Sequence, residues 1–369
     1  MNLKRHGILA GLALTATLAL AACGSDNPTT PGSGSGSSDT KKIDCASGKL
    51  TAQGSSAQAN AIDQWSKIYQ QQCSGAEINY SPTGSGAGIQ AFIAGTADFA
   101  GSDSALKDAD EQPKADARCK DGKALDLPMV TGPIAVAYNL SGVKDLQLKP
   151  ATIAKIFTGT VKTWDAAEIK ADNPNVSLPS TPILAVHRSD SSGTTDNFTK
   201  FLAATATSDW SFGNDKVWKA PGGQAEKGSD GVAGAITKSA GAVGYVEWSF
   251  AQTNNLSMAK VGNAGGEFVA LTGESAGKTI AGATDKGSGN NIKLSIDYNT
   301  KEPGAYPIVL VTYEIVCEKG TPSDKVALLK SFLTYTVSTD GQSALAEIGY
   351  APLPESVRGK VETAIAGLA

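Results

Sequence analysis

Three short segments of the chain place hydroxyl side chains and glycine together, directly before a predicted helix. They are Gly54-Ser55-Ser56, Gly84-Ser85-Gly86 and Ser192-Gly193-Thr194. A helix N-terminus carries about half a positive charge and has N–H groups without intrahelical partners, so it binds anions well. For one turn alone, N-capping is the simpler explanation, because Ser, Thr and Gly are preferred caps. Three such turns that converge would bind a tetrahedral oxyanion mainly through uncharged donors.

A charged pair lies beside the third turn. Arg188 follows a predicted strand, four residues before Ser192, and its planar guanidinium offers a fork of donors that suits phosphate. Asp190, two residues further on, is expected to support that fork by pairing with it. The alternative is a surface Arg–Asp pair, which would contribute little to stability.

Asp103 is the unusual residue of this set, because a carboxylate at an anion site repels its ligand. The repulsion disappears when the ligand supplies a proton for the carboxylate to accept. Hydrogenphosphate keeps such a proton near neutral pH and sulfate does not, so Asp103 would accept the first anion and repel the second. The alternative is that Asp103 caps the segment 104–106.

Serine hydroxyls are also nucleophiles in hydrolases. The nucleophile candidates are Ser55, Ser56, Ser85 and Ser192. The chain has two histidines, and His6 lies in a segment that we expect to be removed, so His187 is the one imidazole base left. Arg188 beside it disfavours protonation of that ring. No acidic cluster suggests a dinuclear metal site. We therefore expect no catalytic residue, no metal ion and no cofactor.

Two segments are similar to nucleotide-binding motifs. Residues 86–91 fit G-x-G-x-x-A after a predicted strand, which is a weak signal in a chain with 41 glycines. Residues 273–279 are similar to a P-loop, but Thr272 stands where the first glycine is needed and no buried strand precedes it. We therefore expect neither segment to bind a nucleotide.

The composition limits the classes of partner. The length of 369 residues corresponds to about two domains. The chain carries 32 basic and 36 acidic residues, a formal net charge of −4, so nothing attracts it globally to nucleic acid. We expect no nucleic-acid partner and a monomer.

The N-terminus has the features of an exported precursor. A short basic segment precedes an apolar run of about thirteen residues, which is too short to span a bilayer. Leu20-Ala21-Ala22-Cys23 follows and resembles the bacterial lipobox, in which the chain is cut before a cysteine that becomes lipidated. We expect residues 1–22 to be a lipoprotein signal peptide and Cys23 to be lipidated. An ordinary signal peptide with a coincidental cysteine is the alternative.

The segment after Cys23 lacks apolar side chains. Residues 24–39 are Ser, Gly, Pro, Asp, Asn and Thr, so residues 23–44 are expected to be a flexible tether to the outer face of the cell membrane.

Four cysteines remain, and an even number in an exported protein favours two disulfides with three pairings to consider. Cys45 precedes a predicted strand and Cys73 follows the next helix, which favours Cys45–Cys73 and Cys119–Cys317. Free buried thiols are the alternative.

Alternating strands, turns and helices must position the three turns. From residue 50 onward, the pattern predicts strands at 50–53, 77–81 and 97–101, helices at 60–72 and 89–94, and a glycine-rich turn at 84–88. This alternation is typical of an α/β domain with parallel strands. Ligands bind beyond the carboxyl ends of such strands, which is where the turns lie.

The rest of the chain continues the pattern. Residues 127–138 form an extended apolar segment that contains Gly132-Pro133. The other predicted strands are 183–187, 242–247 and 306–316, and the other predicted helices are 149–157, 165–170, 195–204, 231–238, 323–336 and 342–347.

From about Leu50 to the C-terminus, the sequence resembles the phosphate-binding lipoproteins of Pst-type ABC transporters, particularly those of actinobacteria. The segments that carry the resemblance are Gly84–Gly88, Asp98–Asp103, Lys162–Asp165, Arg188–Thr194 and Gly241–Glu247. The resemblance implies an α/β, two-lobed, periplasmic-binding-protein-like (type II) fold with two interlobe crossovers, near 131–133 and 305–308. It implies one lobe from 45–131 with 307–369 and a second from 132–306.

The resemblance also implies a set of phosphate ligands. The positions that match the family's ligand residues are Ser56, the Ala57 amide, Ser85, Asp103, Arg188, Ser192, Gly193 and Thr194. Two positions differ from some members of the family. Ser56 replaces a threonine and keeps the hydroxyl, whereas Ala57 replaces a phenylalanine, so the cover over the ligand is expected to be thinner.

The function implied by the resemblance is high-affinity binding of inorganic phosphate between the lobes and delivery to the membrane permease of an ABC transporter. The alternatives are a receptor for another tetrahedral oxyanion and a secreted hydrolase of the phosphatase type.

Overall fold

The computed structural model describes residues 43–120 and 122–369. The predicted signal peptide, the lipidation site Cys23 and the predicted tether up to residue 42 lie outside the described residues. Among the described residues, no helix combines the length and the apolar character needed to cross a membrane.

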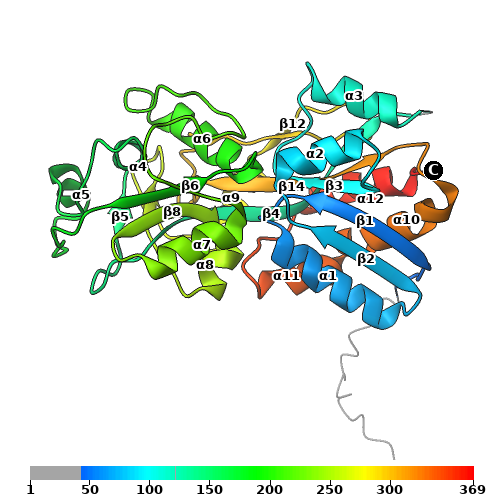
Figure 1. The fold of residues 1–369 in the computed structure, drawn as a ribbon, viewed down its shortest axis with the longest axis horizontal. Helices are drawn as coiled ribbons and strands as arrows, with labels where there is room; N and C mark the ends of the chain where they lie inside the picture. The colour runs from blue at the N-terminus through cyan, green and yellow to red at the C-terminus, as the bar shows by residue number, and fades with distance from the viewer. Residues whose placement is uncertain (1–42, 121) are drawn as a thin grey trace, which may run out of the picture. The chain divides into compact units, whose positions relative to one another are not determined.

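A mixed β-sheet is the centre of the fold, with the strand order β2-β1-β3-β14-β4-β8-β6-β7. At one end, β1 (Gly48–Gly54) pairs in parallel with β2 (Ala76–Ser81) and β3 (Phe99–Ser102). Figure 1 shows these strands at one side of the sheet, with β4 and β14 in its middle. The parallel pairing confirms the α/β class predicted from the sequence.

The other end of the sheet repeats this arrangement. There, β6 (Leu184–Arg188) pairs in parallel with β7 (Gln224–Glu226) and β8 (Ala242–Glu247). Figure 1 shows β1 and β6 both ending toward the middle of the sheet, where the polar turns follow them.

Two strands connect the ends of the sheet. β4 (Ala124–Tyr138) pairs antiparallel with β14 (Val309–Cys317) up to Pro133, and with β8 from Ile134 onward. Every residue of both strands is buried, which explains their nearly continuous apolar sequences. The chain thus crosses twice between two lobes, as predicted. The residue boundaries of the lobes stay a prediction.

Each lobe has its own hydrophobic core. One core contains Trp65, Phe99 and Phe332, and the other contains Trp164, Phe198 and Tyr245. The helices are α1 (Ala59–Gln72), α2 (Ser85–Ile93), α3 (Glu111–Arg118), α4 (Pro150–Phe157), α5 (Ala167–Asp172), α6 (Gly193–Thr205), α7 (Gly228–Lys238), α8 (Trp248–Thr253), α9 (Gly273–Ala281), α10 (Ser323–Val337), α11 (Thr339–Ala346) and α12 (Glu355–Ala366). The short strands are β5 (Gln147–Leu148), β9 (Ser257–Met258), β10 (Lys260–Gly262), β11 (Phe268–Val269), β12 (Thr284–Asp285) and β13 (Leu294–Ser295).

The predicted glycine-rich turn at 84–88 is wrong in extent. Gly84 has a φ of 99° and precedes the helix, but α2 begins at Ser85 and includes Gly86 and Gly88. A Cβ on Gly88 would lie 2.5 Å from the Cα of Gly54, so this glycine allows α2 to pack closely against β1. Close packing, rather than a turn, accounts for the glycine here.

Helices α3, α8, α9 and α12 were missed by the sequence patterns. In α9, Thr272 and Ser275 form a capping box, so the segment similar to a P-loop is the start of an ordinary capped helix. Residues 86–91 likewise lie inside α2.

Two disulfides each tie the end of a helix to another segment of the chain. Cys45 is bonded to Cys73 at the end of α1, and Cys119 at the end of α3 is bonded to Cys317 of β14. Both pairings favoured from the sequence are confirmed.

We predict that the two disulfides contribute unequally to stability. Cys119 and Cys317 are 198 residues apart, whereas Cys45 and Cys73 are 28 apart. A longer closed loop restricts the unfolded chain more. Replacing Cys119 and Cys317 by serine should therefore lower the free energy of unfolding by about 2 kcal/mol more than replacing Cys45 and Cys73. Urea unfolding of both double variants measures this difference. A larger loss for the Cys45–Cys73 variant would contradict it.

Candidate functional site

The N-termini of two helices meet at the buried side chain of Asp103. Asp103 directly follows β3 and is 2% exposed. Ser85 begins α2 and Gly193 begins α6, and the Gly193 amide donates to Ser85 Oγ over 3.1 Å. A Cβ on Gly193 would lie 2.5 Å from the Cβ of Asp103, so only glycine allows this approach. The turns that are far apart in the sequence therefore converge in space.

Four hydroxyl groups donate to the Asp103 carboxylate. Oδ1 accepts hydrogen bonds from Ser55 Oγ and, over 2.8 Å, from Thr312 Oγ1. Oδ2 accepts longer bonds from Ser85 Oγ at 3.4 Å and Thr194 Oγ1 at 3.3 Å. All four donors are uncharged hydroxyls.

Arg188 is the buried cation of the site. It ends β6, is 2% exposed, and donates from Nε to Asp190 Oδ1 over 2.7 Å and from Nη2 to Oδ2 over 2.5 Å. The Gly228 amide adds a bond of 3.1 Å to Asp190 Oδ1. The suggested contact between Arg188 and Asp190 is thus present, as a bidentate pair that fixes the plane of the guanidinium.

Burial and charge act in opposite directions on the two carboxyls. Burial raises the pKa of Asp103, although the hydroxyls of Ser55 and Thr312 and the charge of Arg188 favour its ionised form. Burial would also raise the pKa of Asp190, but its hydrogen bonds to Arg188 outweigh burial and hold that pKa below its ordinary value. Asp190 therefore stays ionised, and Asp103 is the carboxyl whose proton affinity is high.

The first turn reaches the other lobe through Ser56. Its Oγ lies 3.0 Å from Ser229 Oγ and accepts from the Ser229 amide over 3.0 Å. The Ala57 amide donates to Ser55 Oγ over 3.1 Å. Ser192 Oγ accepts from the Thr195 amide over 3.2 Å, so it caps α6. The polar groups of Ser56, Ala57 and Ser192 thus bond to protein partners in this arrangement.

Several residues that shape the site escaped the sequence patterns. Thr312 lies inside an apolar strand, and its partner Asp103 is 209 residues away. Ser229 is 173 residues from Ser56. The sequence places Ser55 in the first polar turn but does not indicate that its hydroxyl donates to Asp103. The contact of Thr312 with Asp103 could be predicted only if the register of β14 against β3 were known. No local pattern in the sequence gives that register.

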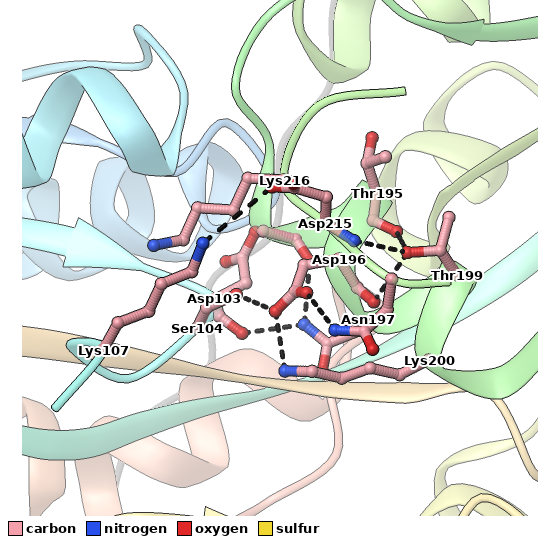
Figure 2. Close-up of polar contacts among 12 residues, drawn as sticks. Asp103, Ser104, Lys107, Thr195, Asp196, Asn197, Thr199, Lys200, Asp215 and Lys216 are labelled. Carbon is pink, nitrogen blue, oxygen red and sulfur yellow. Dashed lines mark hydrogen bonds and ion pairs between the residues drawn. The ribbon is translucent and has the colours of Figure 1, made fainter. Parts of the chain in front are cut away.

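Ionic contacts join the lobes beside the site, and Figure 2 shows one of them, between Lys107 and Asp215. Lys216 Nζ contacts both carboxylate oxygens of Glu111, at 2.8 and 3.0 Å. Lys107 Nζ lies 3.9 Å from Asp215 Oδ1. Lys216 is 3% exposed, so its pairing with Glu111 takes place largely out of water. These contacts favour the lobes being together.

Neutral donors add to these contacts. Ser104 Oγ donates to Asp196 Oδ2 over 2.6 Å, and Asn197 Nδ2 donates to the Asp103 carbonyl over 2.7 Å. Figure 2 shows Asp196 and Asn197, both in the first turns of α6, directed toward the segment that contains Asp103 and Ser104. α6 thus contacts the other lobe both at its N-terminus and along its first two turns.

The chain matches a family model described as a PBP superfamily domain over residues 35–340. It is 43% identical to the phosphate-binding proteins PstS3 of Mycobacterium bovis and PstS 3 of Mycobacterium tuberculosis, over the full length of both chains. It is 39% identical to PstS 2 of Mycobacterium tuberculosis, over 99% of each chain.

Solved structures share the fold at lower identity. An ancestral soluble variant of the human phosphate binding protein has a TM-score of 0.69 at 20% identity, covering 86% of this chain and 93% of its own. A high-affinity periplasmic phosphate-binding protein solved with phosphate has a TM-score of 0.66 at 21% identity, with the same coverage. A phosphate-bound transporter substrate-binding protein from Clostridium perfringens has a TM-score of 0.60 at 17% identity, covering 83% of this chain and 100% of its own.

We predict that Lys216→Met destabilises the protein, because it leaves the largely buried Glu111 carboxylate without its cation. The expected cost is about 2–3 kcal/mol, below the value for a fully buried pair, since Glu111 keeps some exposure. Urea unfolding measures the loss. Lys219→Met is the matched control, because Lys219 is half exposed and its pair with Asp215 lies on the surface. Equal effects of the two variants would contradict a special role of the buried pair.

Proposed function

The chain belongs to the PBP superfamily and, within it, to the PstS family of phosphate-binding proteins, and from this we propose that it binds inorganic phosphate outside the cytoplasm for an ABC transporter. The members of this family are transport proteins and not enzymes. The observation that carries the proposal is the convergence of two helix N-termini and a buried arginine around the carboxylate of Asp103.

We propose that phosphate lies between the lobes and replaces some of the direct contacts between them. The proposed ligands are Ser56, the Ala57 amide, Ser85, Asp103, Arg188, Ser192, Gly193 and Thr194. Arg188 would neutralise part of the ligand charge, and Asp190 would hold its guanidinium plane. The amides of Gly193 and Thr194 at the start of α6 would bind further ligand oxygens. Asp103 would accept the remaining proton of hydrogenphosphate.

The lobes would close on the ligand as a hinge. The proposed lobes are 45–131 with 307–369, and 132–306, with β4 and β14 as the connecting strands. Ligand contacts from both lobes favour the closed arrangement. The contacts between the lobes beside the site are formed in this structure. They support the interpretation that this structure is the closed arrangement.

The attachment to the membrane is also a proposal. Residues 1–22 would be removed, Cys23 would carry the lipid, and residues 23–44 would let the lobes reach the transporter. A single flexible anchor of this kind keeps the receptor at the outer face of the cell membrane. We propose that the protein acts there as a monomer and delivers phosphate to the membrane permease.

Two observations weigh against the alternatives. His187 stacks on Trp218, with ring centroids 5.0 Å apart and an angle of 12°. Successive residues of a strand point to opposite faces, so the imidazole of His187 points away from the face that carries Arg188, and a hydrolase would lack its base there. A receptor for a fully deprotonated oxyanion would have to tolerate the buried carboxylate of Asp103.

We predict that Asp103→Asn relaxes the discrimination between phosphate and sulfate. The amide removes the negative charge that repels sulfate and adds an N–H donor that either anion accepts. Isothermal titration calorimetry with each anion at neutral pH gives the ratio of affinities, which should fall by at least about tenfold. Selectivity equal to that of the wild type would contradict the role of Asp103.

We predict that Arg188→Ala causes a severe loss of phosphate affinity. Two or three charge-assisted hydrogen bonds would be lost, and Asp190 would face the anion without its cation, so a loss of at least about 100-fold is expected. The same titration measures it. Arg358→Ala removes an equal charge from an exposed pair on α12 and should leave affinity unchanged. Wild-type affinity in Arg188→Ala would place the site elsewhere.

A further inference from the structure

A threonine of the connecting strand β14 contacts the carboxylate of Asp103. Thr312 is completely buried, and its Oγ1 donates to Asp103 Oδ1 over 2.8 Å. The β14–β4 register shifts at this point, because Thr312 pairs with Val130 while the next residue pairs with Pro128. Such bulges increase the local twist and re-aim side chains beside functional sites. Thr312 is thus held in place by its pairing with β4, and the next residue, Tyr313, pairs with Ser102 of β3.

The two oxygens of Asp103 have different partners. Oδ1 accepts from Ser55 and Thr312, and neither residue belongs to the proposed phosphate ligands. Oδ2 accepts from Ser85 and Thr194 over 3.4 and 3.3 Å, and both of these residues do belong to that set. When the last two hydroxyls turn to a bound anion, Oδ2 becomes free to accept, while Oδ1 stays occupied.

We propose that Thr312 is a positioning residue for anion specificity, whose hydroxyl keeps Asp103 ionised and keeps Oδ2 directed at the ligand. This inference rests on the proposed phosphate-binding function. A threonine hydroxyl that donates to a carboxylate favours the ionised form over the protonated one. Without it, Asp103 gains a proton more readily and becomes a donor. A protonated Asp103 donates a hydrogen bond to sulfate as readily as to hydrogenphosphate, so the protein no longer discriminates between the two anions.

Burial makes the contribution of Thr312 important. Burial raises the pKa of Asp103, whereas each hydroxyl that donates to this carboxylate favours its ionised form. The other titratable or charged groups around Asp103 are Arg188 of β6, Glu247 of β8, Glu314 of β14, Tyr80 of β2, Tyr350 after α11, and Asp196 with Lys200 on α6.

These neighbours keep a constant charge in the acidic range. Burial raises the pKa of Glu314 to about 8 and that of Glu247 well above its ordinary value, so both carboxyls are neutral there. The pKa values of the two phenols are also raised by burial. Hydrogen bonds and the charge of Lys200 overcome the effect of burial on Asp196 and lower its pKa. The named neighbours therefore keep one charge state in this range, whereas burial raises the pKa of Asp103 above its ordinary value.

The test compares Thr312→Val with Thr312→Ser. Valine keeps the shape of the side chain and removes the donor, whereas serine keeps the donor and removes a methyl group. Calorimetric titration with sulfate, from pH 5 to 7, gives the pH midpoint at which sulfate binding appears, which reports the protonation of Asp103. Phosphate titrations in the same buffers give the selectivity.

In Thr312→Val, the midpoint should rise by about one pH unit, because a hydrogen bond to a charged group is lost. The preference for phosphate over sulfate at pH 6 should fall about tenfold. Thr312→Ser should keep both wild-type values. Equal shifts in the two variants, or no shift in Thr312→Val, would overturn the inference while leaving phosphate binding in place.

Ser55→Ala provides a second variant if Thr312→Val does not fold. It removes the other donor to Oδ1, so the midpoint should rise in the same direction, and an unchanged midpoint would overturn the inference. A wild-type protein that does not bind phosphate would instead overturn the proposed function, and this inference with it.

Discussion

The burial of one carboxylate constrains the rest of the site. A carboxylate out of water is costly unless hydrogen bonds compensate for its lost hydration. Asp103 obtains these bonds from four hydroxyls, which are carried by β14, by α2, by α6 and by the turn after β1. No single segment of the chain could supply them all. The carboxylate is therefore satisfied only when these segments, which come from both lobes, lie together.

The architecture of the sheet makes that meeting possible. Because β4 and β14 run through both lobes, the ends of β1, β3 and β6 are brought to a common boundary. Gly193 removes the side chain that would separate α6 from Asp103. Around this boundary, the buried pair of Lys216 and Glu111 stabilises the same arrangement by charge. Anion recognition by an acidic protein follows naturally, since the donors at the site are hydroxyls, amides and one arginine.

Several features of the fold and the site could be predicted from the sequence because their causes are local. The parallel strands around α1, the buried crossing segment at 127–138 and both disulfide pairings agree with the structure. The turn predicted at 84–88 was wrong because glycine is read as a helix breaker, whereas Gly88 is present for close packing against Gly54. The short helices α3 and α8 were missed because tertiary contacts, more than their own periodicity, stabilise them.

The sequence by itself determined the types of donor and their places at strand ends and helix starts. It did so because a turn, a cap and an Arg–Asp pair two residues apart depend on neighbouring residues. Only the tertiary structure decided which donors meet: Thr312 with Asp103 across 209 residues, Ser56 with Ser229 across 173, and Lys216 with Glu111 across 105. Contacts of this kind depend on strand register and on the packing of the lobes, and neither is encoded in the spacing of residues along the chain.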